Sequence, residues 1–269
     1  MGKQPRASFK APQSQRAALA QAALVAPPSP SAYTDGLVIG YCTPGEVDAR
    51  FCDSLTGTLM HDRTRGNRVW GMTMLETGPR ITEARSQIVD AFLHSAEVCV
   101  NGKHPDWLLM VDSDMKWEPD APFRLIDSAL AVGAKIMGGL CMGGGHAGMF
   151  PTLYGLERLE NGELSPHKLT EWPDGAIVKV GATGAAFLLV HREVYLKMAH
   201  DHFLLPDGTP EPHPWFIEGR RKGNQYGEDI GFCMRALASG FNVYVDTAVE
   251  IGHMKRVELT LKAWRESRP

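Results

Sequence analysis

The sequence predicts an α/β fold, with a single Rossmann-like domain in which a central, mostly parallel sheet is flanked by helices. Three observations support this class. Apolar runs of strand length alternate with segments of helical periodicity. Hydrophobic residues make up 43% of the 269 residues, enough for one large core. The apolar run from Trp107 to Val111 leads directly into Asp112-Ser113-Asp114, and open α/β sheets bind ligands at the carboxyl ends of their strands.

The first half of the chain alternates strand and helix. The expected elements are a strand at 37–42, a helix at 47–59, a strand at 69–75, a helix at 81–96, the acidic-tipped strand at 107–111, a helix to about 132 and a strand at 134–141. Asp120 is expected to cap the helix that ends near residue 132, with Pro122 in its first turn. The run 143–145, three glycines, predicts a flexible loop.

The second half is less regular. Its expected elements are short strands at 152–156 and 176–180, a strand at 185–190, helices at 192–200 and 228–238, a strand at 241–245 that extends to 251, and a polar tail from 252. Gly240 is placed to end the second of these helices. Residues 201–224 contain four prolines and predict a long loop, which in a compact domain is usually functional or mobile.

The two ends of the chain are expected to lie outside the folded domain, which spans 35–256. Residues 1–34 carry four basic residues and no acid, which predicts a flexible basic arm. A transit peptide or a docking arm is the alternative for this segment. Residues 257–269 are expected to form a C-terminal tail.

Composition excludes several classes of protein. The net charge of −3 argues against a general nucleic-acid binder, which would carry a basic surplus. The five cysteines are scattered without a CxxC pair, so neither a zinc knuckle nor a disulfide framework is indicated, and a reducing compartment is expected. No apolar run approaches the roughly 18–20 residues that a transmembrane helix needs, so no transmembrane segment is expected.

Three short motifs carry chemistry. Asp112 and Asp114 offer hard oxygen ligands that suit Mg²⁺ or Mn²⁺ with substrate phosphates, although a bare Asp-x-Asp also fits a solvated turn. Strand alternation would point both side chains roughly the same way. Glu228 and Asp229 open a helix, where they either complement its dipole or supply a general base. His253 is either a structural hydrogen-bonding residue or a metal ligand alongside Asp114.

These motifs, in this order, resemble the nucleotide-sugar glycosyltransferases of the GT-A fold, especially family 2-like enzymes of bacteria and bacteriophages. The matching segments are 108–114, 181–190 with Arg192, 226–233 and Gly252-His253. In addition, Glu83-Ala84-Arg85-Ser86 resembles an Ala-Arg-Asn segment of such enzymes, with Ser86 in place of Asn. The resemblance covers about residues 36–256.

The resemblance implies a metal-dependent transfer of a sugar from a nucleotide-diphosphate sugar to a hydroxyl acceptor, such as a protein or a glycan. Asp114, Asp112 less directly and His253 would hold Mn²⁺ or Mg²⁺, which would act as a Lewis acid on the departing nucleoside diphosphate. The residues expected at the donor are Thr43, Pro44, Arg85, Asp112, Ser113, Asp114, Lys255 and Arg256. For Lys255 and Arg256 the alternative is a solvated surface pair.

On the acceptor side, the resemblance implies Gly184, Ala185 and Trp215. For Trp215, packing in a proline-rich loop is the equal alternative. Asp229 is expected to be the general base of an inverting transfer, with Glu228 as the second choice. Retaining enzymes of this fold also carry these acids, so the configuration of the product decides between the two courses.

Two other functions compete with glycosyl transfer. Nucleotidyltransferases usually carry a glycine-rich, basic loop after the first strand, whereas residues 43–48 offer one glycine and two acids, Glu46 and Asp48. The same segment lacks the acid that GT-A enzymes usually place immediately after that strand. A non-catalytic carbohydrate-binding relative is the third possibility, and the intact acidic motifs argue against it. The expected location is the cytoplasm, that of the host if a bacteriophage encodes the chain.

Overall fold

The computed structural model describes residues 35–77, 80–145, 148–160, 164–200, 215–221 and 224–255. Its elements are β1 (Leu37–Thr43), α2 (Ala49–Arg65), β2 (Val69–Glu76), α3 (Ile81–His94), η1 (Ala96–Val98), β3 (Trp107–Asp112), β4 (Met115–Lys116), α4 (Ala121–Val132), β5 (Ile136–Gly145), β6 (Gly148–Pro151), β7 (Leu153–Arg158), β8 (Leu164–Lys168), β9 (Ile177–Val180), β10 (Ala182–Thr183), β11 (Phe187–His191), α5 (Arg192–His200), β12 (Gly219–Arg221), β13 (Asn224–Tyr226), α6 (Glu228–Ala238) and β14 (Val243–His253). The expected basic arm and C-terminal tail lie outside the described residues.

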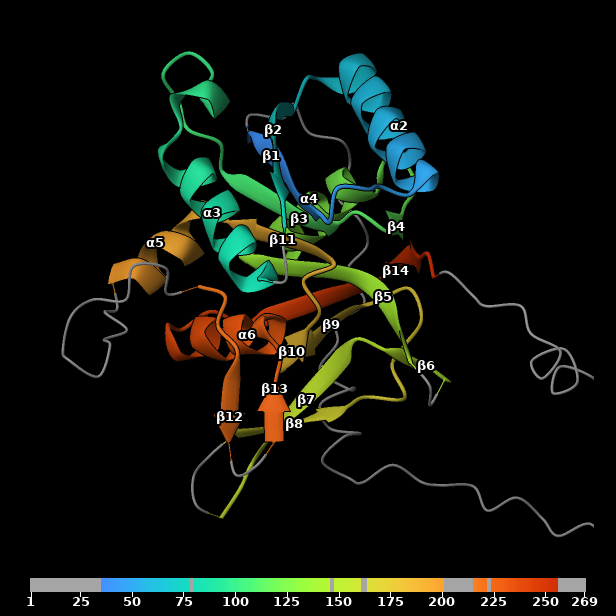
Figure 1. The fold of residues 1–269 in the computed structure, drawn as a ribbon, viewed down its shortest axis with the longest axis vertical. Coiled ribbons are helices and arrows are strands. Elements are labelled where there is room, and N and C mark those ends of the chain that lie inside the picture. Colours follow the sequence, from blue (N-terminus) through green and yellow to red (C-terminus); the bar gives the residue numbers. More distant parts are fainter. Residues whose placement is uncertain are drawn as a thin grey trace, which may run out of the picture.

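A mixed sheet forms the centre of the molecule (Figure 1). Nine strands of the described residues belong to it, in the order β2-β1-β3-β11-β5-β14-β4, with β6 beside β5 and β9 beside β14. β1 runs parallel to β2 and β3, and β14 runs parallel to β5. β11 is antiparallel to both of its neighbours. The expected α/β fold, with a largely parallel central sheet and flanking helices, is therefore confirmed.

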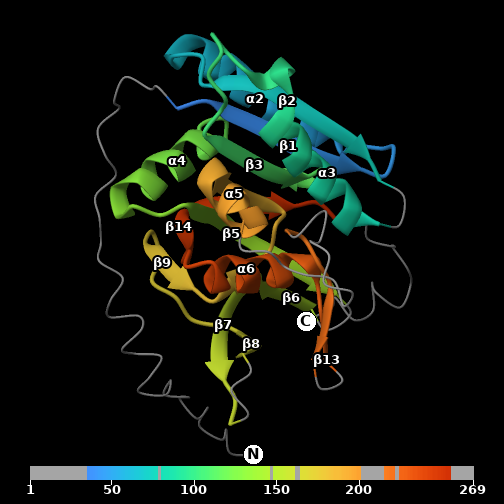
Figure 2. The same cartoon turned by 90° about the vertical axis from the view of Figure 1, so that its left-hand side faces the viewer.

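Each face of the sheet is covered by its own set of helices (Figures 1 and 2). Alternating residues of β3 separate the two cores, because strand side chains point to opposite faces. Leu108 and Met110 pack with residues of α3, α5 and α6. Leu109 and Val111 pack with residues of α2 and α4. The carboxyl ends of β1 and β3 are thus held between two apolar layers, which fixes their positions.

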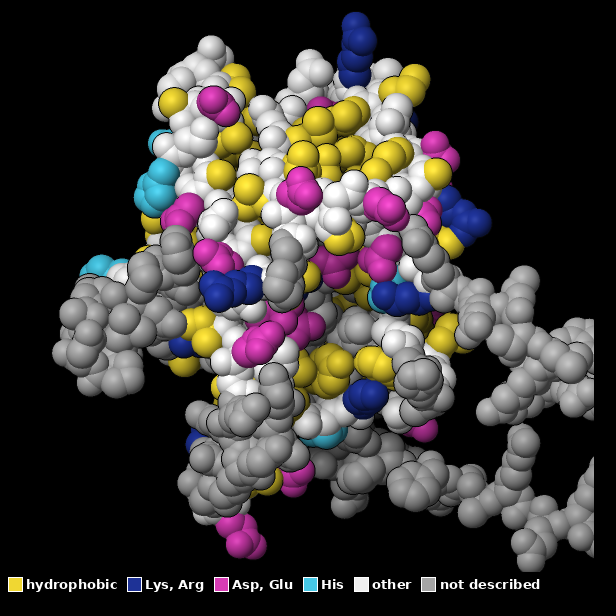
Figure 3. Space-filling model, in the orientation of Figure 1, with side chains coloured by type: hydrophobic (Ala, Val, Ile, Leu, Met, Phe, Trp, Pro, Cys, Tyr) yellow, Lys and Arg dark blue, Asp and Glu magenta, His cyan; other side chains and the backbone are white. Residues whose placement is uncertain are grey.

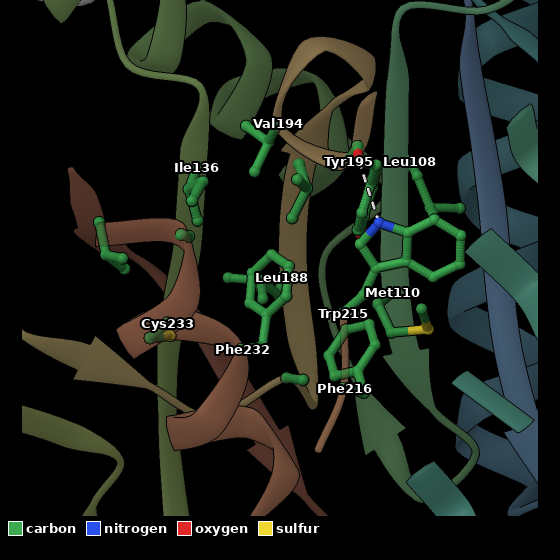
Figure 4. Close-up of a cluster of buried hydrophobic side chains, with 14 of the residues drawn as sticks. Leu108, Met110, Ile136, Leu188, Val194, Tyr195, Trp215, Phe216, Phe232 and Cys233 are labelled. Carbon is green, nitrogen blue, oxygen red and sulfur yellow. Dashed lines mark hydrogen bonds between the residues drawn. The ribbon is translucent and has the colours of Figure 1, made fainter. Parts of the chain in front are cut away.

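Aromatic side chains lie among aliphatic ones in the core beneath α5 and α6 (Figure 4). Phe216 stacks on Phe232, with ring centroids 4.8 Å apart. Trp215 is 3% exposed, and its indole Nε1 donates a hydrogen bond of 3.0 Å to the carbonyl of Tyr195. Trp215 therefore packs in the core, and the expectation that it presents a face to an acceptor sugar is corrected. Packing, the alternative expected for Trp215, is what the structure shows, since its ring also lies against that of Tyr195.

Most expected elements are confirmed, with shifts at their ends. The helices expected at 192–200 and 228–238 coincide with α5 and α6. Helix α2 begins at Ala49 because Asp48 caps it, accepting a hydrogen bond of 2.9 Å from the backbone N–H of Arg50. Asp120 does occupy the N-cap of α4, but its side chain makes no capping hydrogen bond.

The expected loop at 143–145 is wrong. These glycines belong to β5, which pairs with β6 as a hairpin from Met142 opposite Pro151 to Gly145 opposite Gly148. The expected tail also starts too early, since Gly252 and His253 complete β14.

Small strands add two features that the pattern did not predict. β10, β7 and β8 form a second sheet, and β12 pairs with β13 within the segment expected to be loop. Both lie at the end of the molecule opposite β2 (Figure 1). Among the residues that the structure describes, no helix is long and apolar enough to cross a membrane.

Candidate active site

A cleft of about 880 Å³ opens at the carboxyl ends of β1 and β3. Its charged lining residues are Glu46, Asp48, Asp112, Asp114, Arg50 and Lys255. Pro44 and Ser113, both expected at the donor, also line it. On the face drawn in Figure 3, acidic side chains gather across the middle with basic side chains at either side. The cleft therefore lies where open α/β sheets bind ligands.

The two aspartates of the acidic motif bind different partners. Asp112 is the last residue of β3, and its Oδ1 accepts a hydrogen bond of 2.6 Å from Arg85. Asp114 follows in the turn between β3 and β4, and its Oδ2 lies 3.0 Å from His253 and 3.1 Å from Lys255. The expected strand alternation does not extend to Asp114, because β3 ends at Asp112. Of the two aspartates, only Asp114 contacts His253, the other expected metal ligand.

Strand pairing positions His253. The end of β14 pairs with β4, so that His253 lies opposite Met115, the residue after Asp114. The backbone N–H of Met254 also donates a hydrogen bond of 2.8 Å to the carbonyl of Asp114. The imidazole Nδ1 donates to the carbonyl of Met142 at 2.9 Å, which turns Nε2 toward the Asp114 carboxylate. A histidine oriented by a backbone carbonyl in this way has the geometry of a metal ligand.

The charges of this pair reinforce each other. Burial alone would raise the pKa of Asp114, but hydrogen bonds from His253 and Lys255 outweigh burial and hold that pKa below its ordinary value. The hydrogen bond with Asp114 raises the pKa of His253 against the opposing effect of its partial burial. Asp114 is thus held as an ionised carboxylate by the hydrogen bonds from His253 and Lys255.

The residues at this place fit a divalent cation with few protein ligands. No group of three or more His, Cys, Asp or Glu side chains that could hold a metal occurs within the described ranges. One carboxylate and one imidazole nevertheless match the ligand preferences of Mn²⁺. A cation bound with phosphates takes only one or two protein carboxylates and completes its shell with phosphate oxygens and water. Asp114 and His253 would therefore leave most positions around such an ion to phosphate oxygens and water.

Arg85 lies behind the cleft rather than in it. Its guanidinium, with 4% of the side chain exposed, bonds Asp112 through Nη2 and Glu228 through Nη1. Its Cζ also lies 5.9 Å from the ring centre of Phe216. Burial lowers the pKa of Arg85, but Asp112 and Glu228 outweigh burial and raise it above the ordinary value, so the group stays charged. Glu228, the second-choice base, is occupied by this contact.

Asp229 lies beside Gly184, the glycine expected on the acceptor side. Its Oδ1 accepts a hydrogen bond of 2.7 Å from the backbone N–H of Ile230. A methyl group on Gly184 would lie 3.6 Å from Asp229 Oδ2 and 3.4 Å from Cβ of Thr152. Burial, together with the charge of Glu228, raises the pKa of Asp229 above its ordinary value. A carboxylate with a raised pKa is a better proton acceptor near neutral pH, as a general base must be.

Of the other residues expected at the donor or the acceptor, some line the cleft and others are buried in the core. Thr43 is buried, donates a hydrogen bond of 2.7 Å to the carbonyl of Glu46 and so closes the turn after β1. Ala185 is 1% exposed and packs in the core. Lys255 lines the cleft, whereas Arg256 lies outside the described residues.

Three further residues of the site carried no sequence signal of their own. Arg50 lines the cleft from the first turn of α2, and its Nη1 lies 3.2 Å from Sδ of Met254. Tyr154 lies near Asp229, and burial with that negative charge raises the pKa of its phenol. Cys42 lines the cleft, and burial raises the pKa of its thiol to about 11, which keeps the thiol neutral. Cys42 therefore serves as an apolar wall.

Comparisons with known proteins bear on the fold. No family model matches the sequence. No curated protein matches it either. The solved structure titled "Crystal Structure of A197 from STIV" matches with a TM-score of 0.50 and 16% identity, over 82% of this chain and 86% of that chain. "Crystal structure of GalNAc-T7 with UDP, GalNAc and Mn2+" matches with a TM-score of 0.48 and 11% identity, over 83% of this chain and 44% of that chain. At 16% identity, the likeness to A197 shows a shared fold.

Proposed function

We propose that this chain is a metal-dependent glycosyltransferase that moves a sugar from a nucleotide-diphosphate sugar to a hydroxyl acceptor. The observation that carries the proposal is the contact of His253 with Asp114, which lines the cleft at the carboxyl end of β3. It combines an anionic oxygen and an oriented imidazole, the ligands that suit a cation shared with a diphosphate. Asp229, held near Arg85 and Asp112 by α6, supplies the proton acceptor that the transfer requires.

Charge balance in the cleft supports the metal requirement. Four carboxylates, those of Glu46, Asp48, Asp112 and Asp114, line the cleft with two cationic side chains, Arg50 and Lys255, while Arg85 bonds Asp112 from behind. A nucleoside diphosphate would bring further negative charge into this lining, and like charges at short range oppose binding. A divalent cation at Asp114 and His253 removes that repulsion. When bound, it supplies Lewis-acid stabilisation of the leaving diphosphate.

The chain's own groups would divide the remaining work. Arg50 and Lys255 contact donor phosphates, and Pro44, Ser113 and Cys42 form the wall beside them. Lys255 already lies 3.1 Å from Asp114, at the edge where the diphosphate would bind. A lysine there acts as a point charge that follows the phosphate.

Asp229 rather than Glu228 is the proposed base of an inverting transfer. Glu228 is bonded to Arg85, whereas Asp229 Oδ2 faces the space beside Gly184. Asp229 takes the proton from the acceptor hydroxyl as that oxygen attacks the sugar carbon, and the bond from that carbon to the diphosphate breaks. The acceptor would reach this carboxylate from the side of Gly184, where Thr152 and Asp229 are the nearest side chains.

The test uses the purified chain with Mn²⁺ and a panel of nucleotide sugars, and measures which nucleotide product is released. Release of a nucleoside diphosphate that requires Mn²⁺, is lost in Asp114→Ala and persists in Asp53→Asn supports the proposal. Asp53 is an exposed aspartate of α2 and is the matched control. The anomeric configuration of the product, read by NMR, then establishes whether transfer inverts.

Other outcomes contradict the proposal. Release of pyrophosphate indicates nucleotidyl transfer instead. Failure of every nucleoside diphosphate to stabilise the protein with Mn²⁺ indicates a non-catalytic relative of the fold.

A further inference from the structure

We infer that Arg85 is a positioning residue that links the donor side of the site to the helix bearing the catalytic base. The inference rests on the proposed function. The guanidinium of Arg85 does not line the cleft. It bonds two carboxylates from different elements, Asp112 at the end of β3 and Glu228 at the start of α6. No other side-chain bond between β3 and α6 is found in the described part of the chain.

The first step is geometric. Arg85 lies in the second turn of α3 and is 3% exposed, so its head group cannot reach solvent or a ligand without leaving the core. Its planar fork binds one carboxylate through each terminal nitrogen. A fork with fixed geometry orients both partners at once, which a flexible ammonium group does not do. Arg85 therefore sets the distance between Asp112 and Glu228.

The second step concerns Asp229. It follows Glu228 in the first turn of α6, so holding Glu228 also holds the backbone that carries Asp229. With the Glu228 carboxylate tied to Arg85, Asp229 is the carboxylate of this turn that remains for the acceptor. A shift of about 1 Å in such a group is enough to cost roughly a hundredfold in rate. The link thus acts on the chemical step through Asp229.

The third step separates this role from phosphate binding. Among the donor contacts proposed above, Asp114 bonds His253 and Lys255 rather than Arg85. Weakening the link therefore leaves nucleotide binding in place while misplacing the base. Direct contact between Arg85 and the diphosphate would produce the opposite pattern.

The experiment compares Arg85→Lys, Glu228→Gln and the double variant with the wild type. The readouts are kcat and KM for the donor that the wild type uses, and the stabilisation that its nucleoside diphosphate gives with Mn²⁺. The matched controls are Arg80→Lys and Glu83→Gln, which alter an exposed ion pair at the start of the same helix. Urea unfolding midpoints show whether each variant is folded, and Glu228→Gln keeps the test valid if Arg85→Lys is not.

The expected result is a loss of about tenfold or more in kcat for each single variant, with KM and nucleotide binding changed less than about threefold. The double variant should lose no more than the worse single variant, because both break the same link. A tenfold rise in KM with unchanged kcat would overturn the inference in favour of phosphate contact. Multiplying losses in the double variant would also overturn it. An inactive wild type would instead overturn the proposed function, and the role of the link with it.

Discussion

The imidazole of His253 lies 3.0 Å from the carboxylate of Asp114, although 139 positions separate them along the chain. Backbone pairing of β14 with β4 produces this contact, and the hydrogen bond to the Met142 carbonyl fixes the ring. Both side chains are therefore oriented before any ligand binds. Pairing of β4 with β14 thus holds the turn that carries Asp114 against the strand that carries His253.

Removal of either member of this pair should abolish the effect of metal on nucleotide binding. In a thermal shift assay, Mn²⁺ with the preferred nucleoside diphosphate should raise the Tm of the wild type, because ligands that bind the folded state stabilise it. Asp114→Ala and His253→Ala should each lose this rise. Asp53→Asn should keep it. Equal rises in all four proteins would exclude a metal role for the pair.

The rate of transfer should depend on the ionisation of Asp229. Because burial and Glu228 raise its pKa, protonation of this base begins at higher pH than for an ordinary aspartate. The rate should fall as the pH falls through that raised pKa, and Asp229→Asn should lose most of the activity, with no acid limb in the residual rate. An acid limb at the pH of an ordinary carboxylate would contradict this assignment.

The raised pKa of Asp229 also predicts how this residue affects the stability of the fold. A folded-state pKa above the unfolded value adds stability below the unfolded pKa, and that stability is lost as the pH rises through the folded pKa. At neutral pH the ionised carboxylate is therefore unfavourable in the fold. Asp229→Asn should raise the Tm at pH 7 and show a smaller difference from wild type at pH 4. A lower Tm at pH 7 would show that the charge is well compensated.

Gly184→Ala should separate transfer from donor binding. The added methyl group meets only ordinary contacts, at 3.4 Å to Thr152 and 3.6 Å to Asp229, so the fold should tolerate it. It would, however, fill the space beside Asp229 Oδ2. Transfer to the acceptor should fall while nucleotide stabilisation persists. Gly144→Ala, where no atom lies within 4 Å of the new methyl, is the control and should leave both unchanged.

Truncating a buried leucine should lower the free energy of unfolding more than truncating an exposed one. Leu188 of β11 is 0% exposed, whereas Leu196 of α5 is 45% exposed. Leu188→Ala should lower the free energy of unfolding by about 2–5 kcal/mol through lost transfer energy and a cavity. Leu196→Ala should change it by about 0.5 kcal/mol or less. Urea denaturation measures both, and similar losses in the two variants would show that this core is not packed as described.

Local patterns predicted the elements that carry the site. The strand ending at Asp112 is an uninterrupted apolar run, and α6 begins at Glu228 with acids in its first turn. Both signals lie within one element, so sequence alone reveals them. For the glycines after residue 142 the sequence prediction was wrong, because a contact with another strand decides their conformation. Their backbone freedom suggests a loop, but pairing with β6 decides their conformation.

The contacts of Arg85 could not be predicted from the sequence. Its partner Glu228 is 143 positions away, and no periodicity connects the two segments. The burial of Trp215 likewise depends on its contact with Tyr195 of α5, not on the prolines beside it in the sequence. These contacts depend on packing between distant elements, which no local motif encodes.

The pairing of β14 places a length constraint on the chain. Its register is irregular between Asp246 and Glu250, and regular pairing resumes from there to His253 opposite Met115. A strand that slips by one residue turns its side chains to the opposite face. Insertions can therefore be absorbed before Glu250, where the ladder is already interrupted. A single residue gained or lost between Glu250 and His253 would keep the sheet intact yet point the imidazole away from Asp114.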